Sequence, residues 1–193
     1  MANKAIFLDK DGTLIPDIPY NVEPELIMLQ ENAVTGLKRL QDDGYLLIII
    51  SNQSGVARGY FTESALIAVE SKMKSLFEAN GLVLTGFYYC PHHPQGIVTG
   101  YDMQCDCRKP EPGMLVKAAA DHDIDFTISW MIGDILNDVE AGNRTRCRTV
   151  LIDNGNETEW EKGDYRVPTT ICKTIDEAAE QILKMNSHAL AEL

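Results

Sequence analysis

Long hydrophobic runs, internal repeats and low-complexity segments are absent from this sequence of 193 residues. No apolar stretch approaches the roughly 20 residues that a membrane-spanning helix needs. The first residues run directly into an apolar, strand-like segment and carry no cleavage site of a secretory signal. We therefore expect a cytoplasmic protein. Apolar residues make up 45% of the chain, which is enough to pack a single domain over residues 1–193.

Basic residues are also scarce. The chain has 17 Lys and Arg against 29 Asp and Glu, which gives a net charge of −12. A surface this acidic repels nucleic acids and anionic membranes, so we expect neither as a partner. A small phosphorylated substrate remains compatible with this charge, because binding it needs positive charge only at the site. We expect the protein to act on such a substrate as a monomer.

Cysteine is rare, but its distribution is uneven. Three of the five cysteines fall within residues 90–107, and such clustering without a secretion signal favours a metal over a disulfide. A Cys-x-His pair and a Cys-x-Cys pair supply four ligands for a closed, tetrahedral, structural Zn²⁺ site. His93 is an alternative to His92, which we prefer. The predicted zinc ligands are Cys90, His92, Cys105 and Cys107. The isolated Cys147 and Cys172 are predicted to be core residues.

Strand-like and helix-like segments alternate along the chain. This order predicts an α/β fold, a three-layer, Rossmann-like, doubly wound parallel sheet with helices on both faces. The second helix is expected to begin with Thr62 as its N-cap. The predicted strands are Ala5–Leu8, Tyr45–Ile50, Phe87–Tyr89, Ile128–Ile132 and Thr149–Ile152. The predicted helices cover residues 32–43, 62–79, 112–122, 136–142 and 175–185.

Polar groups follow the predicted strands where a parallel sheet of this kind binds its ligands. The first strand is followed by Asp9-Lys10-Asp11-Gly12-Thr13 and the second by Ser51-Asn52-Gln53-Ser54-Gly55. Arg108-Lys109 precedes a predicted helix, and Gly133-Asp134 with Asp138 follows another strand. We expect these four groups to converge at one edge of the sheet.

The chemistry of these groups is coherent. Asp9, Asp11 and Asp134 form an oxygen-rich, anionic cluster of the kind that Mg²⁺ prefers. A carboxylate such as Asp9 can attack phosphorus and form an aspartyl-phosphate, while Asp11 can protonate the leaving oxygen and later activate water. Ser51 and the backbone N–H groups after it can hold phosphoryl oxygens. Lys109 supplies positive charge against the transition state.

Each group alone is weak evidence for a catalytic site, because an isolated Asp-x-Asp is ordinarily a pair of solvated loop carboxylates. Together, in this order, they resemble the four motifs of the haloacid dehalogenase-type phosphatases across nearly the whole chain. The resemblance implies Asp9 as nucleophile, Asp11 as acid/base, and Ser51 and Lys109 as phosphate-binding groups. It also implies that Mg²⁺ is bound by Asp9, by Asp11 through its backbone carbonyl and by Asp134, with Asp138 in support.

The spacing of the motifs leaves no room for a lid domain, so a capless phosphatase is expected. Specificity then falls to residues 16–20, residues 53–59 and the zinc loop at residues 90–107, which would position Arg108 and Lys109. Arg58 and Arg108 can each bind a second phosphate or a carboxylate, although Arg58 can equally be a solvated loop charge.

Within the family, the long zinc loop and the stretch from Asn52 to Phe61 resemble phosphatases of sugar bisphosphates. That resemblance implies substrate contacts at Asp17, Ile18, Pro19, Tyr20, Asn52, Gln53, Ser54, Arg108 and Lys109. Members of this subgroup commonly carry Lys where this chain has Ile135, and Ile cannot pair with a phosphate. No function is assigned to residues 144–147 or 153–166.

Three alternatives stay open. A histidinol-phosphate phosphatase would use the same chemistry, although such enzymes tend to have a shorter metal loop. A non-catalytic phosphate- or zinc-binding module would lack the nucleophile or the acid/base, and both are present. A nucleic-acid 3′-phosphatase is disfavoured by the acidic charge and the lack of a basic stripe.

Overall fold

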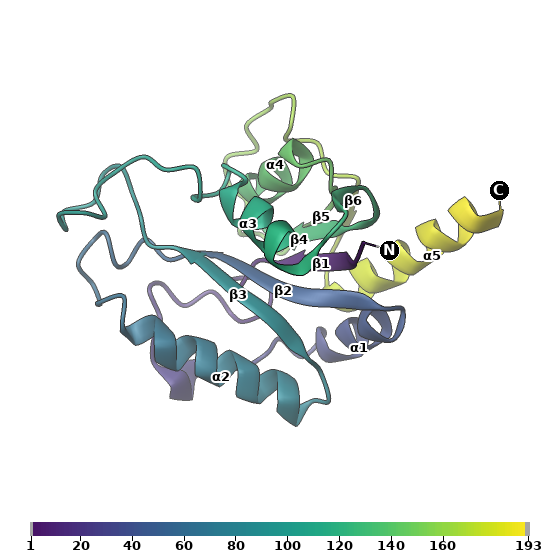
Figure 1. Ribbon diagram of the computed structural model, residues 1–193, viewed down its shortest axis with the longest axis horizontal. Helices are drawn as coiled ribbons and strands as arrows, with labels where there is room; N and C mark the ends of the chain where they lie inside the picture. Colours follow the sequence, from purple (N-terminus) through teal and green to yellow (C-terminus); the bar gives the residue numbers. More distant parts are fainter. Residues whose placement is uncertain (1, 192–193) are drawn as a thin grey trace.

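The computed structural model describes residues 2–191, and strands and helices alternate along them (Figure 1). The strands are β1 Lys4–Leu8, β2 Tyr45–Asn52, β3 Leu84–Cys90, β4 Trp130–Gly133, β5 Arg148–Ile152 and β6 Thr170–Cys172. The α-helices are α1 Val34–Asp42, α2 Ala65–Ala79, α3 Gly113–His122, α4 Leu136–Arg144 and α5 Ile175–Ala191. Short 3-10 helices cover Pro24–Leu26 and Phe126–Ile128.

The described strands form one parallel sheet in the order β3-β2-β1-β4-β5-β6. The order reverses at β1, so β1 lies between β2 and β4. Leu8, at the end of β1, pairs with Ile49 on one side and with Ile132 on the other. The register therefore places the residues that follow β1, β2 and β4 at the same edge of the sheet.

Helices cover both faces of the sheet. Alternate side chains of β1 point to opposite faces, as in any strand. Ile6 and Leu8 pack with residues of α1, α2 and α5, whereas Ala5 and Phe7 pack with residues of α3. Helix α4 lies on β4 and β5. The predicted three-layer, doubly wound fold is confirmed, and between β1 and β2 the described chain forms only loops, a 3-10 helix and α1 rather than a cap.

Several local predictions were wrong. Helix α2 begins at Ala65, and the Thr62 hydroxyl contacts the Ser64 hydroxyl at 2.8 Å instead of capping the helix. Ile128 lies in a 3-10 helix, because the Asp125 carboxylate accepts the Thr127 backbone N–H and starts a turn. Strand β6 was not predicted. None of the described helices is long and apolar enough to cross a lipid bilayer.

Candidate active site

The residues that follow β1 are held in a tight turn. The Gly12 N–H donates to the Ile15 carbonyl, and the N–H groups of Leu14 and Ile15 both donate to the Lys10 carbonyl. Gly12 has φ +84°, and a Cβ at this position would lie 2.2 Å from Asp134 Oδ2. Glycine is therefore required both by the backbone conformation and by the close approach of Asp134. This turn brings the β1 motif against the motif that follows β4.

Lys109 is the centre of the buried charges. Its side chain is almost fully buried, and its ammonium lies 2.5 Å from Asp9 Oδ1, 2.6 Å from Asp138 Oδ1 and 2.8 Å from the Ile50 carbonyl oxygen. Burial alone lowers the pKa of Lys109, but Asp138 and Asp9 outweigh burial and raise it. Lys109 is therefore charged, and it donates hydrogen bonds to Asp9 and the Ile50 carbonyl while forming an ion pair with Asp138.

Asn52 fixes the backbone of Lys109. Its side-chain amide donates to the Lys109 carbonyl at 3.1 Å and accepts the Lys109 N–H at 3.0 Å. The amide thus forms a two-point contact between the end of β2 and the segment that precedes α3. Asn52 was predicted to bind substrate, and the structure gives it this additional task of positioning Lys109.

The acidic residues lie close together beneath this lysine. Asp9, Asp134 and Asp138 are buried, and one oxygen of each lies within 4.8 Å of the others. Burial raises the pKa of Asp9, and the nearby charges of Asp138, Asp134 and Asp11 add to this against the opposing effect of Lys109. Burial and the charge of Asp138 raise the pKa of Asp134 to about 6. The cluster thus holds more negative charge than Lys109 balances.

This excess of carboxylate oxygen fits a divalent cation. Asp134 accepts hydrogen bonds from Thr13 Oγ1 at 3.0 Å and from Asn156 Nδ2 at 2.6 Å. These bonds orient its carboxylate but carry no full positive charge, and the pKa of Asp134 stays raised. A hard cation bound by oxygen would supply the missing charge. Asp138 makes its direct contact with Lys109, so its support of such a site is partly to position that lysine.

Asp11 and Ser51 are joined through Gln53. The Gln53 side-chain N–H groups donate to Ser51 Oγ at 2.7 Å and to Asp11 Oδ2 at 3.1 Å. Because Ser51 Oγ accepts here, its own O–H remains free to donate to a phosphoryl oxygen. The buried Lys10 ammonium lies 2.5 Å from the other oxygen of Asp11. Sequence reasoning missed Lys10, whose position between the two aspartates was the only available signal.

Three cavities surround these groups. The catalytic cavity, of about 230 Å³, is lined by Asp9, Asp11, Asp17, Asn52, Lys109, Asp134, Ile135 and Asn156. A second, of about 250 Å³, brings the predicted substrate-binding residues of two loops together with Asp11, namely Asp17, Ile18, Pro19, Tyr20, Asn52, Gln53 and Ser54. A third, of about 610 Å³, includes Lys109, Arg108 and His93. The predicted substrate contacts therefore line the two larger spaces, and Asp17, Asn52 and Lys109 line the catalytic cavity as well.

The loop after β5 contributes residues that the sequence did not reveal. Asn156 lines the catalytic cavity and donates to Asp134. Asn154 Nδ2 donates to the Gly12 carbonyl at 2.7 Å, and Glu157 Oε2 accepts the Leu136 N–H at 2.6 Å. Asn154 stands two residues after the predicted strand Thr149–Ile152, so the strand-end rule was the available signal, although Asn and Glu in a polar loop are also ordinary turn formers.

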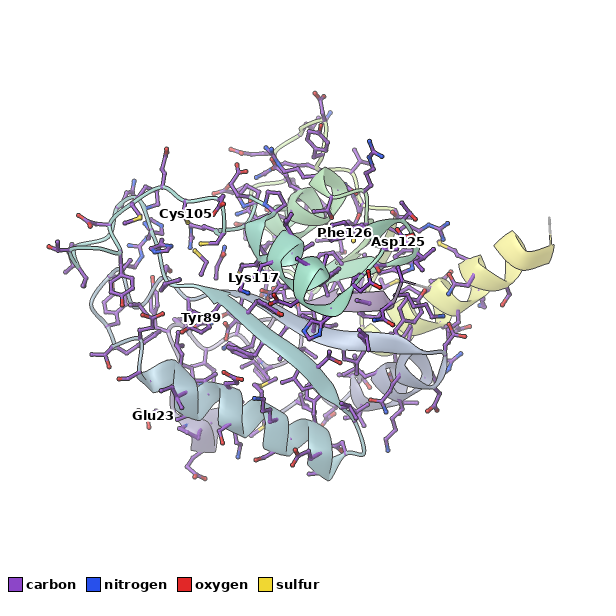
Figure 2. All side chains as sticks on the ribbon, in the orientation of Figure 1. Glu23, Tyr89, Cys105, Lys117, Asp125 and Phe126 are labelled. Carbon is purple, nitrogen blue, oxygen red and sulfur yellow. The ribbon has the colours of Figure 1, made fainter. Side chains whose placement is uncertain are left out.

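The Cys-His segment forms a compact cluster after β3; Figure 2 labels Tyr89 on β3 and Cys105 in the loop that follows. Cys90 Sγ lies 3.4 Å from Cys105 Sγ and 2.9 Å from Cys107 Sγ, and His92 Nδ1 lies 3.4 Å from Cys107 Sγ. Sulfurs that share a tetrahedral zinc ion lie roughly 3.8 Å apart, so a modest expansion would admit one ion. All three cysteines are free.

The same loop leaves His93 outside the sulfur cluster. His93 Nε2 instead lies 3.0 Å from Arg58 Nη2.

The thiols of the sulfur cluster have raised pKa values, and burial is the main cause. The pKa of Cys90 is raised, and that of Cys107 is raised to about 11. A thiolate ligand needs the opposite shift, and a bound cation provides it.

Comparison with known proteins places the chain in a family. Residues 106–178 match a family model described as HAD-hydrolase-like. The chain is 40% identical over 177 residues to the D-glycero-beta-D-manno-heptose-1,7-bisphosphate 7-phosphatase of Haemophilus ducreyi, covering 91% of this chain and 97% of that protein. The chain belongs to the haloacid dehalogenase-like phosphatases.

Two further relatives of the same kind support this placement. The Escherichia coli K12 protein with the same enzyme name is 40% identical over 152 residues, which cover 78% of this chain and 80% of that protein. A crystal structure of the D,D-heptose 1,7-bisphosphate phosphatase of B. bronchiseptica with magnesium and phosphate is 31% identical. It superposes with a TM-score of 0.80 over 94% of this chain and 99% of that one. This haloacid dehalogenase-like phosphatase thus matches these relatives over most of their length.

Proposed function

We propose that this haloacid dehalogenase-like phosphatase removes the 7-phosphate of D-glycero-β-D-manno-heptose 1,7-bisphosphate. The product would be the heptose 1-phosphate, a precursor for lipopolysaccharide core or other heptose-containing glycans. The observation that carries the proposal is the buried Asp9, which faces the catalytic cavity beside Lys109 and Asp134. The choice of sugar is supported by relatives of that name at about 40% identity over most of the chain.

Asp9 is proposed as the nucleophile. Its carboxylate oxygen attacks phosphorus and forms an aspartyl-phosphate while the bond to the sugar oxygen breaks. Lys109 contacts Asp9 at 2.5 Å, so its ammonium can exchange this contact for a phosphoryl oxygen as the phosphate enters. The Ser51 O–H, left free by the contact with Gln53, can bind another phosphoryl oxygen. Both groups would favour the charge that develops in the transition state.

Asp11 is proposed as the acid and then the base. In the first step, protonated Asp11 gives its proton to the leaving sugar oxygen. In the second step, ionised Asp11 takes a proton from water, and the water oxygen attacks phosphorus. Phosphate then leaves, and the Asp9 carboxylate is restored. Lys10 and Gln53 hold the two oxygens of Asp11, which limits its rotation during both transfers.

We infer that Mg²⁺ is the catalytic cofactor. Asp9 and Asp134 would hold it through their side chains and Asp11 through its backbone carbonyl oxygen, with Asp138 in support. The raised pKa values of Asp9 and Asp134 support this assignment. When bound, the ion would neutralise the carboxylates and the substrate phosphate.

We infer a structural Zn²⁺ held by Cys90, His92, Cys105 and Cys107. The four ligand atoms lie within 4.8 Å of one another, and four protein ligands leave no place for a reacting water. The third sulfur belongs to Cys107, two residues before Lys109. Ordering this loop would therefore help to place Lys109 in the catalytic cavity.

The proposal is tested by phosphate release from a panel of substrates at saturating Mg²⁺. The panel contains the α and β anomers of heptose 1,7-bisphosphate, histidinol phosphate and p-nitrophenyl phosphate. We expect the highest kcat/KM for the β-heptose bisphosphate, with product carrying phosphate at carbon 1. A higher kcat/KM for histidinol phosphate would instead assign the protein to that alternative activity.

A further inference from the structure

Two loops meet and bring Arg58 to His93, which lines the cavity of about 610 Å³. The Ala57 carbonyl accepts the N–H groups of Ile97 and Val98 at 2.8 and 3.0 Å, and the Ala57 N–H donates to the Pro91 carbonyl. These backbone bonds fasten residues 56–58 to the zinc loop. As a result, Arg58 Nη2 lies 3.0 Å from His93 Nε2.

The contact between Arg58 and His93 contains more hydrogen-bond donors than acceptors. The Gln95 backbone N–H donates to His93 Nδ1 at 3.0 Å, so Nδ1 carries no proton and the neutral ring carries its proton on Nε2. A neutral imidazole has only one acceptor nitrogen. The Nε2–H of His93 therefore faces an N–H of Arg58, and the alternative tautomer would only move the conflict to Gln95.

The guanidinium of Arg58 has a further unmet donor. Its Nε is buried and has no hydrogen-bond partner among the described residues. Over residues 2–191, neither Arg58 nor Arg108 has a carboxylate within ion-pair distance. This is unexpected in a chain with 29 acidic and 17 basic residues. The Arg108 guanidinium makes only a long hydrogen bond among the described residues, from Nη1 to the His92 carbonyl at 3.5 Å.

The position of Arg58, His93 and Arg108 indicates which kind of ligand would accept their unpaired hydrogen-bond donors. Arg108 and His93 line the cavity of about 610 Å³ that also contains Lys109, and Lys109 lines the catalytic cavity as well. An anion between Arg58, His93 and Arg108 would accept the surplus N–H bonds and balance the two guanidinium charges.

We propose that Arg58 and His93, with Arg108, bind the second, non-reacting phosphate of a bisphosphate substrate. The identity of that phosphate rests on the proposed function, whereas the anion site rests on the donor surplus itself. Arg58 would act as a bidentate donor, which Lys cannot reproduce fully. His93 would then donate a hydrogen bond to the phosphate, whereas its neighbour His92 would bind zinc in the sulfur cluster.

The first experiment measures selectivity. kcat/KM is determined for heptose 1,7-bisphosphate and for heptose 7-phosphate, with the wild type, Arg58→Gln, Arg58→Lys, His93→Gln and the control Arg39→Gln. Arg39 is an exposed charge on α1 and lines none of the three cavities. We expect Arg58→Gln to lower the bisphosphate-to-monophosphate ratio by about 10- to 100-fold. His93→Gln should lower it less, and Arg58→Lys should retain part of it.

The outcomes separate the subsite from the proposed function. A ratio in Arg58→Gln within about twofold of the wild-type ratio overturns the subsite. An equal loss on both substrates also overturns it, because Arg58 would then act only on loop structure. Zinc content is measured for each variant, and Arg39→Gln should behave as the wild type. If the wild type does not prefer the bisphosphate, the proposed function fails, and the second experiment decides the subsite.

The second experiment needs no sugar. The Mg²⁺- and Zn²⁺-loaded protein is treated with beryllium trifluoride, which occupies the position of the reacting phosphoryl group on Asp9. Inorganic phosphate is then titrated by calorimetry. We expect one phosphate to bind the wild type, with a Kd at least about 10-fold higher in Arg58→Gln. Equal binding by both proteins, or no binding by the wild type, overturns the anion site.

Discussion

Replacing Asp134 by Asn should change how the stability of the metal-free protein depends on pH. Asp134 is buried, and burial with the charge of Asp138 raises its pKa from 3.8 to about 6. Among the described residues, its side-chain hydrogen-bond partners are the neutral donors Thr13 and Asn156. The Asn side chain has nearly the same shape but no charge, so the variant isolates the cost of ionising this carboxylate.

The magnitude follows from proton linkage. A rise in pKa from 3.8 to about 6 corresponds to about 3 kcal/mol once the group is ionised in both states. The folded chain binds more protons than the unfolded chain between these two values. The contribution of Asp134 is therefore fully favourable below about pH 4 and is lost as the pH rises through about 6. Between about pH 4.5 and about pH 7.5, the wild type should lose roughly 2 kcal/mol relative to Asp134→Asn.

The assay is urea unfolding at a series of pH values without divalent metal and with zinc retained. The difference in free energy of unfolding, Asp134→Asn minus wild type, should increase with pH by the stated amount. Asp9 increases this difference further, because the charge of Asp134 contributes to the raised pKa of Asp9 and the Asn variant removes that charge. The exposed Asp42→Asn is the matched control and should give a flat difference. A flat or decreasing difference for Asp134→Asn would refute the reasoning.

Three further changes test other parts of the site. Cys107→Ser should lower the zinc content, measured by elemental analysis, below one ion per chain. The control Cys147→Ser, away from the cluster, should retain one ion per chain. Full zinc content in Cys107→Ser would contradict the assigned ligands. Asn156→Ala removes the donor to Asp134 and should raise the Mg²⁺ concentration for half-maximal activity by about 10-fold; an unchanged Mg²⁺ titration would count against this positioning role. Gly12→Ala would place its Cβ 2.2 Å from Asp134 Oδ2 and should abolish measurable turnover; wild-type kcat in this variant would contradict the packing described.

The sequence predicted the framework because the relevant rules act through the backbone. Apolar runs such as Tyr45–Ile50 are buried on both faces, and a parallel sheet gathers the residues after each strand at one edge. Asp9, Ser51 and Asp134 follow from that topology. The structure places His92 with the sulfurs and turns His93 toward Arg58, and His92 as the zinc ligand stays a prediction.

The remaining features depend on contacts between distant segments. The strand β6 has three residues, Thr170–Cys172, and forms because β5 offers an edge for pairing. The loop containing Asn154, Asn156 and Glu157 returns to Gly12, Asp134 and the start of α4. Strand β6 has no local pattern, because tertiary pairing rather than residue preference decides it, whereas Asn154 stands two residues after β5, where the strand-end rule applies.

The central claim is that Asp9 carries the phosphoryl group, and trapping that group tests it most directly. The wild-type enzyme is mixed with heptose bisphosphate and Mg²⁺, quenched in acid within one turnover and reduced with borohydride, and the peptide that contains Asp9 is sequenced by mass spectrometry. An aspartyl-phosphate at Asp9 is reduced to homoserine at that position, whereas the free carboxylate is not. We predict homoserine at position 9 in the wild type and none in Asp9→Asn, which should also be inactive while retaining zinc. Turnover by Asp9→Asn, or trapping at another aspartate, would contradict the account.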